Sequence, residues 1–177
     1  MTISLSLGLL VLRLVVGLTL AAHGAQKLFG WFGGSGLAKM AQGMQAQGLK
    51  PGWFWTAMAV IGEFGGGLSF ALGFLTPLGA AGIFGAMFMA AFKSHWKNGF
   101  WNSKRGLEYP LALLTAGVTI GLTGPGSLSL DALFGINLPS PLLFCVLAAA
   151  ALLVDIIGML ISRPAAVAST EGAPRPS

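Results

Sequence analysis

Charged residues are scarce in this 177-residue sequence: they make up 8% of the chain, whereas hydrophobic residues make up 55%. A soluble domain carries about 25% charged residues, so this composition excludes an ordinary water-soluble fold and predicts helices solvated by lipid. The net charge of +5 does not indicate a nucleic-acid-binding protein. The basic residues lie at the edges of apolar segments and form no stripe interleaved with polar residues.

Cysteine is almost absent as well. Cys145 is the single cysteine and lies inside an apolar segment, which excludes an intramolecular disulfide and a Cys-x-x-Cys thiol relay. The two histidines lie on separate segments without a cysteine or carboxylate cluster, so no metal site is predicted. The sequence also lacks a phosphate-binding loop, a dinucleotide-binding fingerprint and a nucleophile elbow.

Apolar segments long enough to cross a bilayer are abundant. A hydrocarbon core of about 30 Å requires roughly 20 apolar residues in an α-helix. Five segments are predicted to span the membrane: residues 5–29, 53–75, 77–92, 107–122 and 141–161. We therefore expect an all-α integral membrane helical bundle over residues 1–162. Residues 163–177, rich in Ala, Pro, Ser and Thr and without periodicity, are expected to form a disordered cytoplasmic tail.

Basic residues and tryptophans are distributed unevenly between the predicted loops. With five spans, loops 30–52 and 93–106 and the C-terminal tail share one side and carry most of the Lys and Arg, whereas loop 123–140 carries none. The positive-inside rule then places the N-terminus outside and the C-terminus in the cytoplasm. All five tryptophans fall at the predicted cytoplasmic boundary, where amphipathic rings prefer to lie. Residues 35–47 have apolar side chains at helical spacing and predict a short helix on the inner leaflet.

Ionisable side chains inside the predicted spans are the first candidates for function, since each costs several kcal/mol in lipid unless it is paired. Arg13 lies about 12 Å, and Glu63 about 16 Å, from the outer end of its segment at 1.5 Å per residue. We therefore expect a buried ion pair between Arg13 and Glu63. Such a pair either locks two helices in register or takes part directly in ligand or proton chemistry.

Four further ionisable residues lie nearer the ends of the spans. His23 and Asp155 both lie about 9 Å from the inner ends of their segments, so they are predicted to pair if the first and fifth spans touch. His23 either exchanges a proton with a bound quinone, because imidazole changes charge near neutral pH, or bonds one helix to another. Lys27 is expected at the inner interface with its amine reaching water. Glu108 is expected to cap the following helix or to pair with Lys27.

Glycines recur along the second and third predicted spans, and this pattern favours close helix packing. The run Gly65-Gly66-Gly67 follows Glu63 directly. Consecutive glycines pack helices closely, which is the favoured interpretation, or they loosen a helix and admit a flat ligand beside the backbone. In the segment from Gly124 to Asp131, leucines alternate with small polar residues, which predicts a short extended or turn element that caps the bundle or docks a partner.

Four motifs, in order, resemble the DoxX family of bacterial membrane proteins. They are RLVVGLTLAAHGAQKLFG from Arg13, GEFGGGLSFALGFLTPLGA from Gly62, Glu108-Tyr109 at the start of the fourth span, and GPGSLSLD from Gly124. The resemblance implies a four-helix membrane core, to which the fifth span is an addition. In this sequence the residues that correspond to the family motifs are Arg13, Gly17, His23, Gly24, Lys27, Glu63, Gly124, Gly126, Ser129 and Asp131.

The family is similar to a membrane subunit of thiosulfate:quinone oxidoreductase, which implies an inner-membrane subunit of a redox complex that binds a quinone. Two alternatives stay open: a non-catalytic anchor for soluble or membrane redox enzymes, and a small-solute or proton pathway through the ionisable residues. No residue is assigned a catalytic role. The candidate site residues are Arg13, His23, Lys27 and Glu63, with Glu108, Asp131 and Asp155 as secondary candidates.

Overall fold

The computed structural model describes residues 2–162, and the regular elements in that part of the chain are all helical. The predicted C-terminal tail, 163–177, lies outside the described residues. The helices that form the bundle are α1 (Ile3–Leu28), α3 (Gly52–Val60), α4 (Gly66–Leu72), α5 (Thr76–Met89), α6 (Glu108–Thr123) and α8 (Ser140–Ile161). The other elements are α2 (Gly36–Ala46), α7 (Leu130–Leu133), the π-helices η2 (Ile61–Gly65) and η3 (Ala90–His95), and the 3₁₀ turns η1 (Trp31–Gly33), η4 (Trp96–Asn98) and η5 (Asn102–Lys104).

Four helical runs among the described residues are long and apolar enough to cross a membrane: Ile3–Leu28, Gly52–Leu72, Thr76–Asn98 and Ser140–Ile161. The second and third runs are continuous through their π-helices, so the third is longer than the predicted 77–92. The predicted span 107–122 corresponds to α6, which has 16 residues and a length of about 24 Å. Four potential spans are therefore present, and the fifth stays a prediction.

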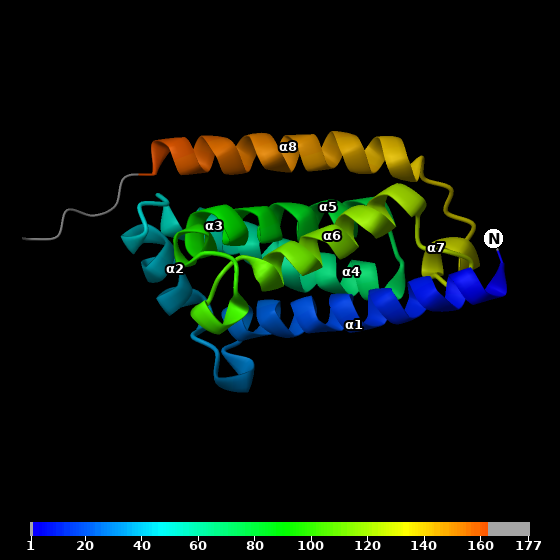
Figure 1. Ribbon diagram of the computed structural model, residues 1–177, viewed down its shortest axis with the longest axis horizontal. Helices are drawn as coiled ribbons and strands as arrows, with labels where there is room; N and C mark the ends of the chain where they lie inside the picture. The colour runs from blue at the N-terminus through cyan, green and yellow to red at the C-terminus, as the bar shows by residue number, and fades with distance from the viewer. Residues whose placement is uncertain (1, 163–177) are drawn as a thin grey trace, which may run out of the picture.

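The long helices run side by side along one axis of the molecule (Figure 1), with α1 on one side of the bundle and α8 on the opposite side. The buried core is built from apolar side chains of α1, α4, α5, α6 and α8. Leu20, Phe70 and Ile83 are completely buried in it. Many other large apolar side chains are exposed, as expected for helices whose outer faces contact lipid.

Glycines set the register between α1 and α4, which run antiparallel to each other. A Cβ placed on Gly17 would lie 2.6 Å from both the nitrogen of Ala71 and the carbonyl oxygen of Gly67, and a Cβ on Gly24 would collide with the backbone of Phe64. The backbones of α1 and α4 are therefore in direct contact. The predicted close packing of small residues is confirmed here. Because Phe64 lies level with Gly24, the first half of α1 extends beyond the end of α4 (Figure 1).

The segment after α6 closes this end of the bundle. It turns back over α1, where Ser127 Oγ lies 2.8 Å from Ser6 Oγ, and then forms the single helical turn α7. Asp131 in α7 accepts hydrogen bonds from the backbone nitrogens of Leu75 (2.7 Å) and Thr76 (3.0 Å) and from Thr76 Oγ1 (2.6 Å). The carboxylate thus satisfies the free N–H groups at the start of α5. The prediction that this segment caps the bundle is confirmed.

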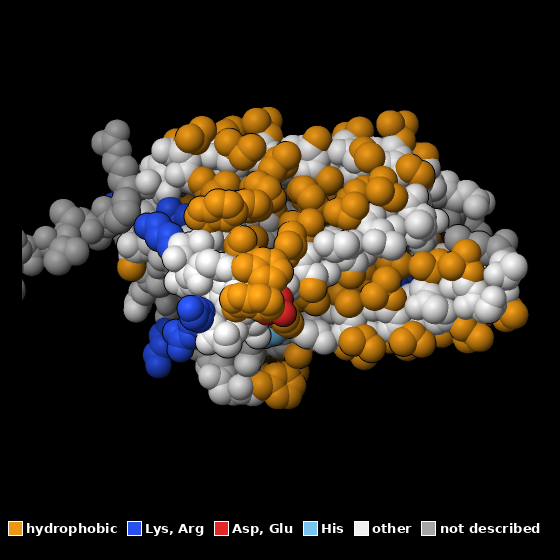
Figure 2. Space-filling view, viewed as in Figure 1, with side chains coloured by type: hydrophobic (Ala, Val, Ile, Leu, Met, Phe, Trp, Pro, Cys, Tyr) orange, Lys and Arg blue, Asp and Glu red, His pale blue; other side chains and the backbone are white. Residues whose placement is uncertain are grey.

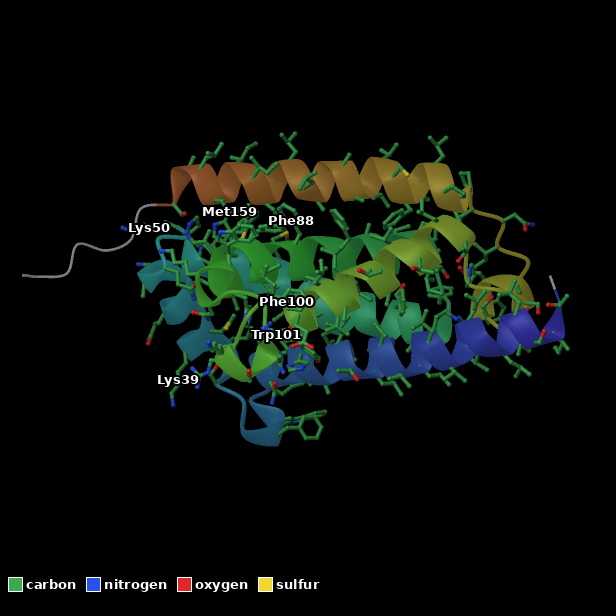
Figure 3. The ribbon with its side chains drawn as sticks, in the orientation of Figure 1. Lys39, Lys50, Phe88, Phe100, Trp101 and Met159 are labelled. Carbon is green, nitrogen blue, oxygen red and sulfur yellow. The ribbon has the colours of Figure 1, made fainter. Side chains whose placement is uncertain are left out.

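Apart from Arg13, the lysine, arginine and tryptophan side chains of residues 2–162 gather at the opposite end of the molecule. Figure 2 shows the Lys and Arg side chains clustered there, whereas hydrophobic side chains cover the length of the helices. In Figure 3, Lys39 and Lys50 lie at the same end as Phe100 and Trp101. The helix predicted over residues 35–47 is present as α2 and has no fully buried residue. This end has the composition of a membrane–water interface.

Candidate functional site

A partly open cavity of about 440 Å³ lies at the basic end of the bundle and is lined by residues of α1, α2, α3, η2, α5, η3 and α8. Most of its wall is formed by alanine, glycine, methionine and other apolar side chains. The residues that supply its polar groups are Lys27, Glu63, Ser94, His95 and Asp155. An apolar chamber with a few convergent polar groups is the usual form of a small-molecule site.

Small residues on α5 create the space. Gly82, Gly85 and their alanine neighbours Ala81 and Ala86 line the cavity, so α5 presents a nearly flat backbone where larger side chains would fill the volume. A Cβ on Gly85 would lie 3.1 Å from Ala151 Cβ and 3.7 Å from Asp155 Oδ2. The side chain of Asp155 on α8 therefore reaches over Gly85 toward α5.

Two π-helices contribute to the cavity wall. The first, η2, supplies Ile61, Gly62 and Glu63, and the second, η3, supplies Ala90, Ser94 and His95. A π-helix inserts a residue into the α-helical ladder and rotates the side chains that follow, and such segments occur frequently at functional sites. Both spans that carry a π-helix thus deviate from regular geometry where they border the cavity.

Glu63 is paired with Lys27. The ammonium group of Lys27, in the last turn of α1, donates to Glu63 Oε1, and the carboxylate is almost completely buried. Within residues 2–162, no group donates a hydrogen bond to the second oxygen, Glu63 Oε2, which is buried as well. The pair neutralises two charges at the cavity wall while leaving one carboxylate oxygen free to accept.

Asp155 carries the second carboxylate of the cavity. The residue is 8% exposed, and in the part of the chain that the structure describes its buried Oδ2 has no hydrogen-bond donor. An unpaired carboxyl group in a buried, apolar setting is costly, since its hydration is lost and nothing replaces it. Such a group points to a ligand or to a proton that it holds.

An aromatic ring closes one end of the cavity. Trp55 on α3 is buried and lines the chamber. A Cβ on Gly158 of α8 would overlap its indole ring, so the glycine lets this ring pack directly against the α8 backbone. Four methionines, Met40, Met44, Met58 and Met89, line the remaining surface. Their flexible thioether chains can adapt to an apolar ligand.

The structure contradicts the predicted ion pair between Arg13 and Glu63. Glu63 binds Lys27, and Lys27 lies 14 residues, or about 21 Å of helix, from Arg13. Arg13 is completely buried beside the turn after α4, and its Nη2 donates to the carbonyl oxygen of Leu128. A Cβ on Gly73 would overlap the Arg13 guanidinium. Arg13 therefore ties α1 to the segment that closes the far end of the bundle, and it lies outside the cavity.

The pair between His23 and Asp155, predicted only if the first and fifth spans touch, does not form, because α1 and α8 lie on opposite sides of the bundle (Figure 1). His23 is exposed on the side of α1, where its Nε2 lies 3.0 Å from the hydroxyl of Tyr109 on α6. The rings meet edge to face, with centroids 5.8 Å apart. This contact is the helix-to-helix hydrogen bond that we considered as the alternative role of His23, whereas Asp155 faces the cavity on the other side of the bundle.

The remaining candidates act in structural contacts. Glu108 does not pair with Lys27; its Oε2 accepts from the backbone nitrogen of Asn102 (2.9 Å) and holds the loop before α6. Asp131 caps α5, as described above. Lys27, expected at the interface with its amine in water, is instead drawn into the pair with Glu63. Within residues 2–162, no three His, Cys, Asp or Glu side chains lie together so that they could hold a metal ion.

Sequence reasoning missed the apolar half of the site. Trp55 was assigned to the membrane–water interface, and the methionines were not predicted to line a site. Nothing in the spacing of these residues indicates that they share a chamber. The usable signal was the small-residue run on α5, Gly79, Gly82 and Gly85, continued by the alanines between them. Such a run packs a helix closely on one side, and here it also leaves unfilled space on another.

These features define a helical membrane protein with a partly charged ligand-sized cavity near one membrane surface. The sequence profile of the DoxX family matches residues 8–96. The chain is also 32% identical over 128 residues to inner membrane protein YqjF of Escherichia coli (strain K12), a match that covers 71% of this chain and 91% of that protein. No solved structure matches the chain. The chain therefore belongs to the DoxX family and is a multi-pass membrane protein.

The region matched by the family profile includes Lys27 and Glu63 but not Asp155. Both members of the ion pair thus lie inside the segment that matches the DoxX family, and each belongs to one of the first two motifs quoted above. Helix α8, which carries Asp155, follows that core and adds the second carboxylate to the cavity.

Proposed function

We propose that this chain is the membrane subunit of an inner-membrane redox complex and that its cavity binds the head group of a lipophilic quinone. The observation that carries the proposal is a cavity of about 440 Å³ with a largely apolar wall, interrupted by an ion pair and a free carboxyl group. Its location is a second support, since the cavity opens among helices apolar enough to lie in lipid. The relative YqjF is named as an inner membrane protein.

A quinone ring matches the groups in the wall. Its faces are apolar and suit the methionines, the alanines and Trp55, and its carbonyl oxygens accept hydrogen bonds. Lys27 has three N–H donors and uses one of them on Glu63. Ser94 and His95 add further donors at the wall. An isoprenoid tail would leave the chamber between helices and enter the lipid.

Electron transfer to or from this quinone is assigned to a partner protein. With one cysteine, the chain has no thiol pair of its own, and the basic loops at the cavity end offer a surface for a soluble redox enzyme. Charged loops of one sign speed association with a partner of opposite sign.

The same loops support the second candidate function, a non-catalytic anchor, in which the cavity is only a packing defect.

We further propose that α6 crosses the membrane, giving five spans with the N-terminus outside. The supports are the basic, tryptophan-rich end described above and the loop 123–140 without Lys or Arg at the other end. In a Cys145→Ser background, Lys97→Cys and Asn137→Cys flank α6. A membrane-impermeant maleimide added to spheroplasts should label Asn137→Cys and spare Lys97→Cys. Equal labelling of both positions would show that α6 does not cross.

Quinone binding is tested with the purified chain in lipid nanodiscs, titrated with decylubiquinone and followed by calorimetry and thermal unfolding. We expect saturable binding that raises the unfolding temperature, because a ligand that binds only the folded state stabilises it. Ala150 lines the cavity from α8, so Ala150→Phe should weaken binding roughly tenfold or more by occupying the space.

The matched control is His23→Ala, which removes an ionisable side chain from a site outside the cavity. It should bind decylubiquinone like the wild type. If the folded wild type shows no saturable binding, the quinone proposal is rejected. Partner capture by the basic loops alone would then favour the anchor.

A further inference from the structure

Four apolar residues line the chamber and are exposed as well: Met58, Ile61, Ala150 and Val154. The first two lie on α3 and η2, and the other two lie on α8. Ile61 is 61% exposed and Val154 is 42% exposed. A side chain that both lines a cavity and is exposed lies at the opening of that cavity. The chamber therefore opens between the α3–η2 run and α8, and these four residues form its rims.

Nearer the basic end of the bundle, the same two helices touch. Trp55 packs directly against the backbone of Gly158, and both residues lie about 5 Å from the basic ends of their helices. The rims lie deeper, since Ile61 is about 14 Å and Val154 about 10 Å from those ends. The interfacial layer of a bilayer is only about 5–8 Å thick on each side. The opening therefore faces lipid chains, and the contact between Trp55 and Gly158 separates it from water.

Helix α5 forms the floor of this opening. A Cβ on Gly62 of η2 would lie 2.7 Å from the carbonyl oxygen of Gly82, and a Cβ on Gly85 would lie 3.1 Å from Ala151 Cβ of α8. Gly82 and Gly85 are one turn apart on α5, so η2 and α8 pack against the same stretch of that helix. The floor between the two rims consists of glycines and alanines of α5 and is therefore smooth enough for an extended chain.

Helix α2 covers the chamber on the water side. Two of its methionines line the cavity, and a Cβ on Gly52 at the start of α3 would overlap the carbonyl oxygen of Ala41, so α2 and α3 are in backbone contact. Ser94, an exposed polar residue of the wall, donates from its Oγ to Oε1 of Gln47 at the end of α2 (3.5 Å). A ligand chain that left on this side would have to pass α2.

The polar and apolar parts of the chamber follow one another with depth. Lys27, Ser94 and His95 supply polar groups at the basic end, whereas the rims around Ile61 and Val154 lie at hydrocarbon depth. A ligand with a polar head and an apolar chain matches this order, with its head near the interface and its chain directed inward. Water is not stable at the rims, so a hydrocarbon chain has to fill the opening.

We infer that the opening between η2 and α8 holds the isoprenoid tail of the quinone and connects the chamber to the bilayer. The inference rests on the proposed function and adds to it the position of the tail. The tail passes between Ile61 and Val154 and enters the lipid there. Because the surrounding lipid is as apolar as the rims, the tail gains little affinity from them. The opening acts through its shape, which makes it sensitive to added bulk.

The first test maps the tail directly. A decylubiquinone analogue with a diazirine in the middle of its tail is photolysed with the full chain in nanodiscs, and the labelled residues are identified by mass spectrometry. We expect labelling around Ile61 and Val154 that excess decylubiquinone suppresses, because both ligands compete for one site. Suppressible labelling of Met40 and Met44 on α2 would place the tail on the water side and overturn the inference. Labelling of the rims that decylubiquinone does not suppress would show that ordinary lipid chains fill the opening, and it would overturn the inference too.

The second test adds bulk to one rim. Val154→Trp should weaken decylubiquinone binding roughly tenfold, because the indole occupies the path of the tail. Duroquinone, a tetramethylbenzoquinone without a tail, should bind this variant and the wild type alike. Leu153→Trp is the matched control, since Leu153 is the adjacent residue of α8, is 60% exposed and is not part of the cavity wall. It should bind both ligands like the wild type.

Two results for Val154→Trp would overturn the inference and leave the proposed function standing. Equal losses for decylubiquinone and duroquinone would show that the indole obstructs the head-group chamber and not a tail. Unchanged decylubiquinone binding would show that no tail lies at this rim. If the wild type binds neither ligand saturably, the proposed function fails and the inference falls with it.

Discussion

Replacing Lys27 with methionine is expected to destabilise the protein by about 3 kcal/mol. Methionine keeps the length and much of the apolar volume of the lysine chain but removes the ammonium group that binds Glu63. The Glu63 carboxylate is almost fully buried and would then have no partner for its charge. Removal of one member of a buried pair usually costs 3–5 kcal/mol, and the lower value is expected because Lys27 is partly exposed.

The measurement is unfolding in mild detergent, by heat and by titration with a denaturing detergent. Lys27→Met combined with Glu63→Gln removes both charges and should recover a large part of the lost stability, since the double variant leaves no buried charge unpaired. Lys39→Met makes the same substitution on the exposed face of α2 and should be close to neutral. Additive effects of the two changes at Lys27 and Glu63 would contradict a coupled pair.

Hydropathy was sufficient to predict an all-α fold and four of the potential membrane spans, because lipid imposes simple rules on helices. Backbone groups in a bilayer must be satisfied internally, so a long apolar segment becomes a helix almost regardless of its detailed sequence. The short surface helix α2 and the capping role of the segment before Asp131 also followed from local patterns. Only the third span was placed too short, because its polar end from Lys93 to Asn98 stays helical beyond the apolar part.

The pairing of charges could not be predicted, because it depends on how the helices are offset along the bundle. Counting depth from the outer ends of the segments assumed that the first two helices end at the same level. In the structure α1 extends well past α4, since Gly17 lies against Gly67 and Gly24 against Phe64. This offset moves Glu63 level with the last turns of α1. Arg13 is left beside the turn after α4.

The glycines that set this offset were recognised as packing residues, but their partners were not. A glycine permits close approach without specifying which backbone approaches it. The partner is chosen by the sum of contacts along both helices, and sequence periodicity does not report that sum. For the same reason the cavity could not be predicted. It exists because facing residues on α5 and α8, such as Gly85 and Ala151, are both small.

Replacing Gly17 with valine is expected to destabilise the protein by about 3 kcal/mol or more. Even the Cβ of the new side chain would lie 2.6 Å from the backbone of α4, at Gly67 and at Ala71. Backbone atoms cannot rotate away as a flexible side chain can, so the two helices would have to separate. Separation at this point would also move the end of α1 that carries Lys27, and the pair with Glu63 would weaken.

Gly8→Val is the matched control, because Gly8 lies on the same helix, is exposed, and would place its Cβ within 4 Å of none of the neighbouring atoms in the described chain. Both substitutions add the same β-branched side chain to α1, so any difference in unfolding temperature reports the contact with α4 alone. We expect Gly8→Val to unfold near the wild-type temperature and Gly17→Val well below it. Equal unfolding temperatures for the two variants would mean that direct backbone contact between α1 and α4 does not fix their register. The position of Glu63 beside Lys27 would then need a different cause.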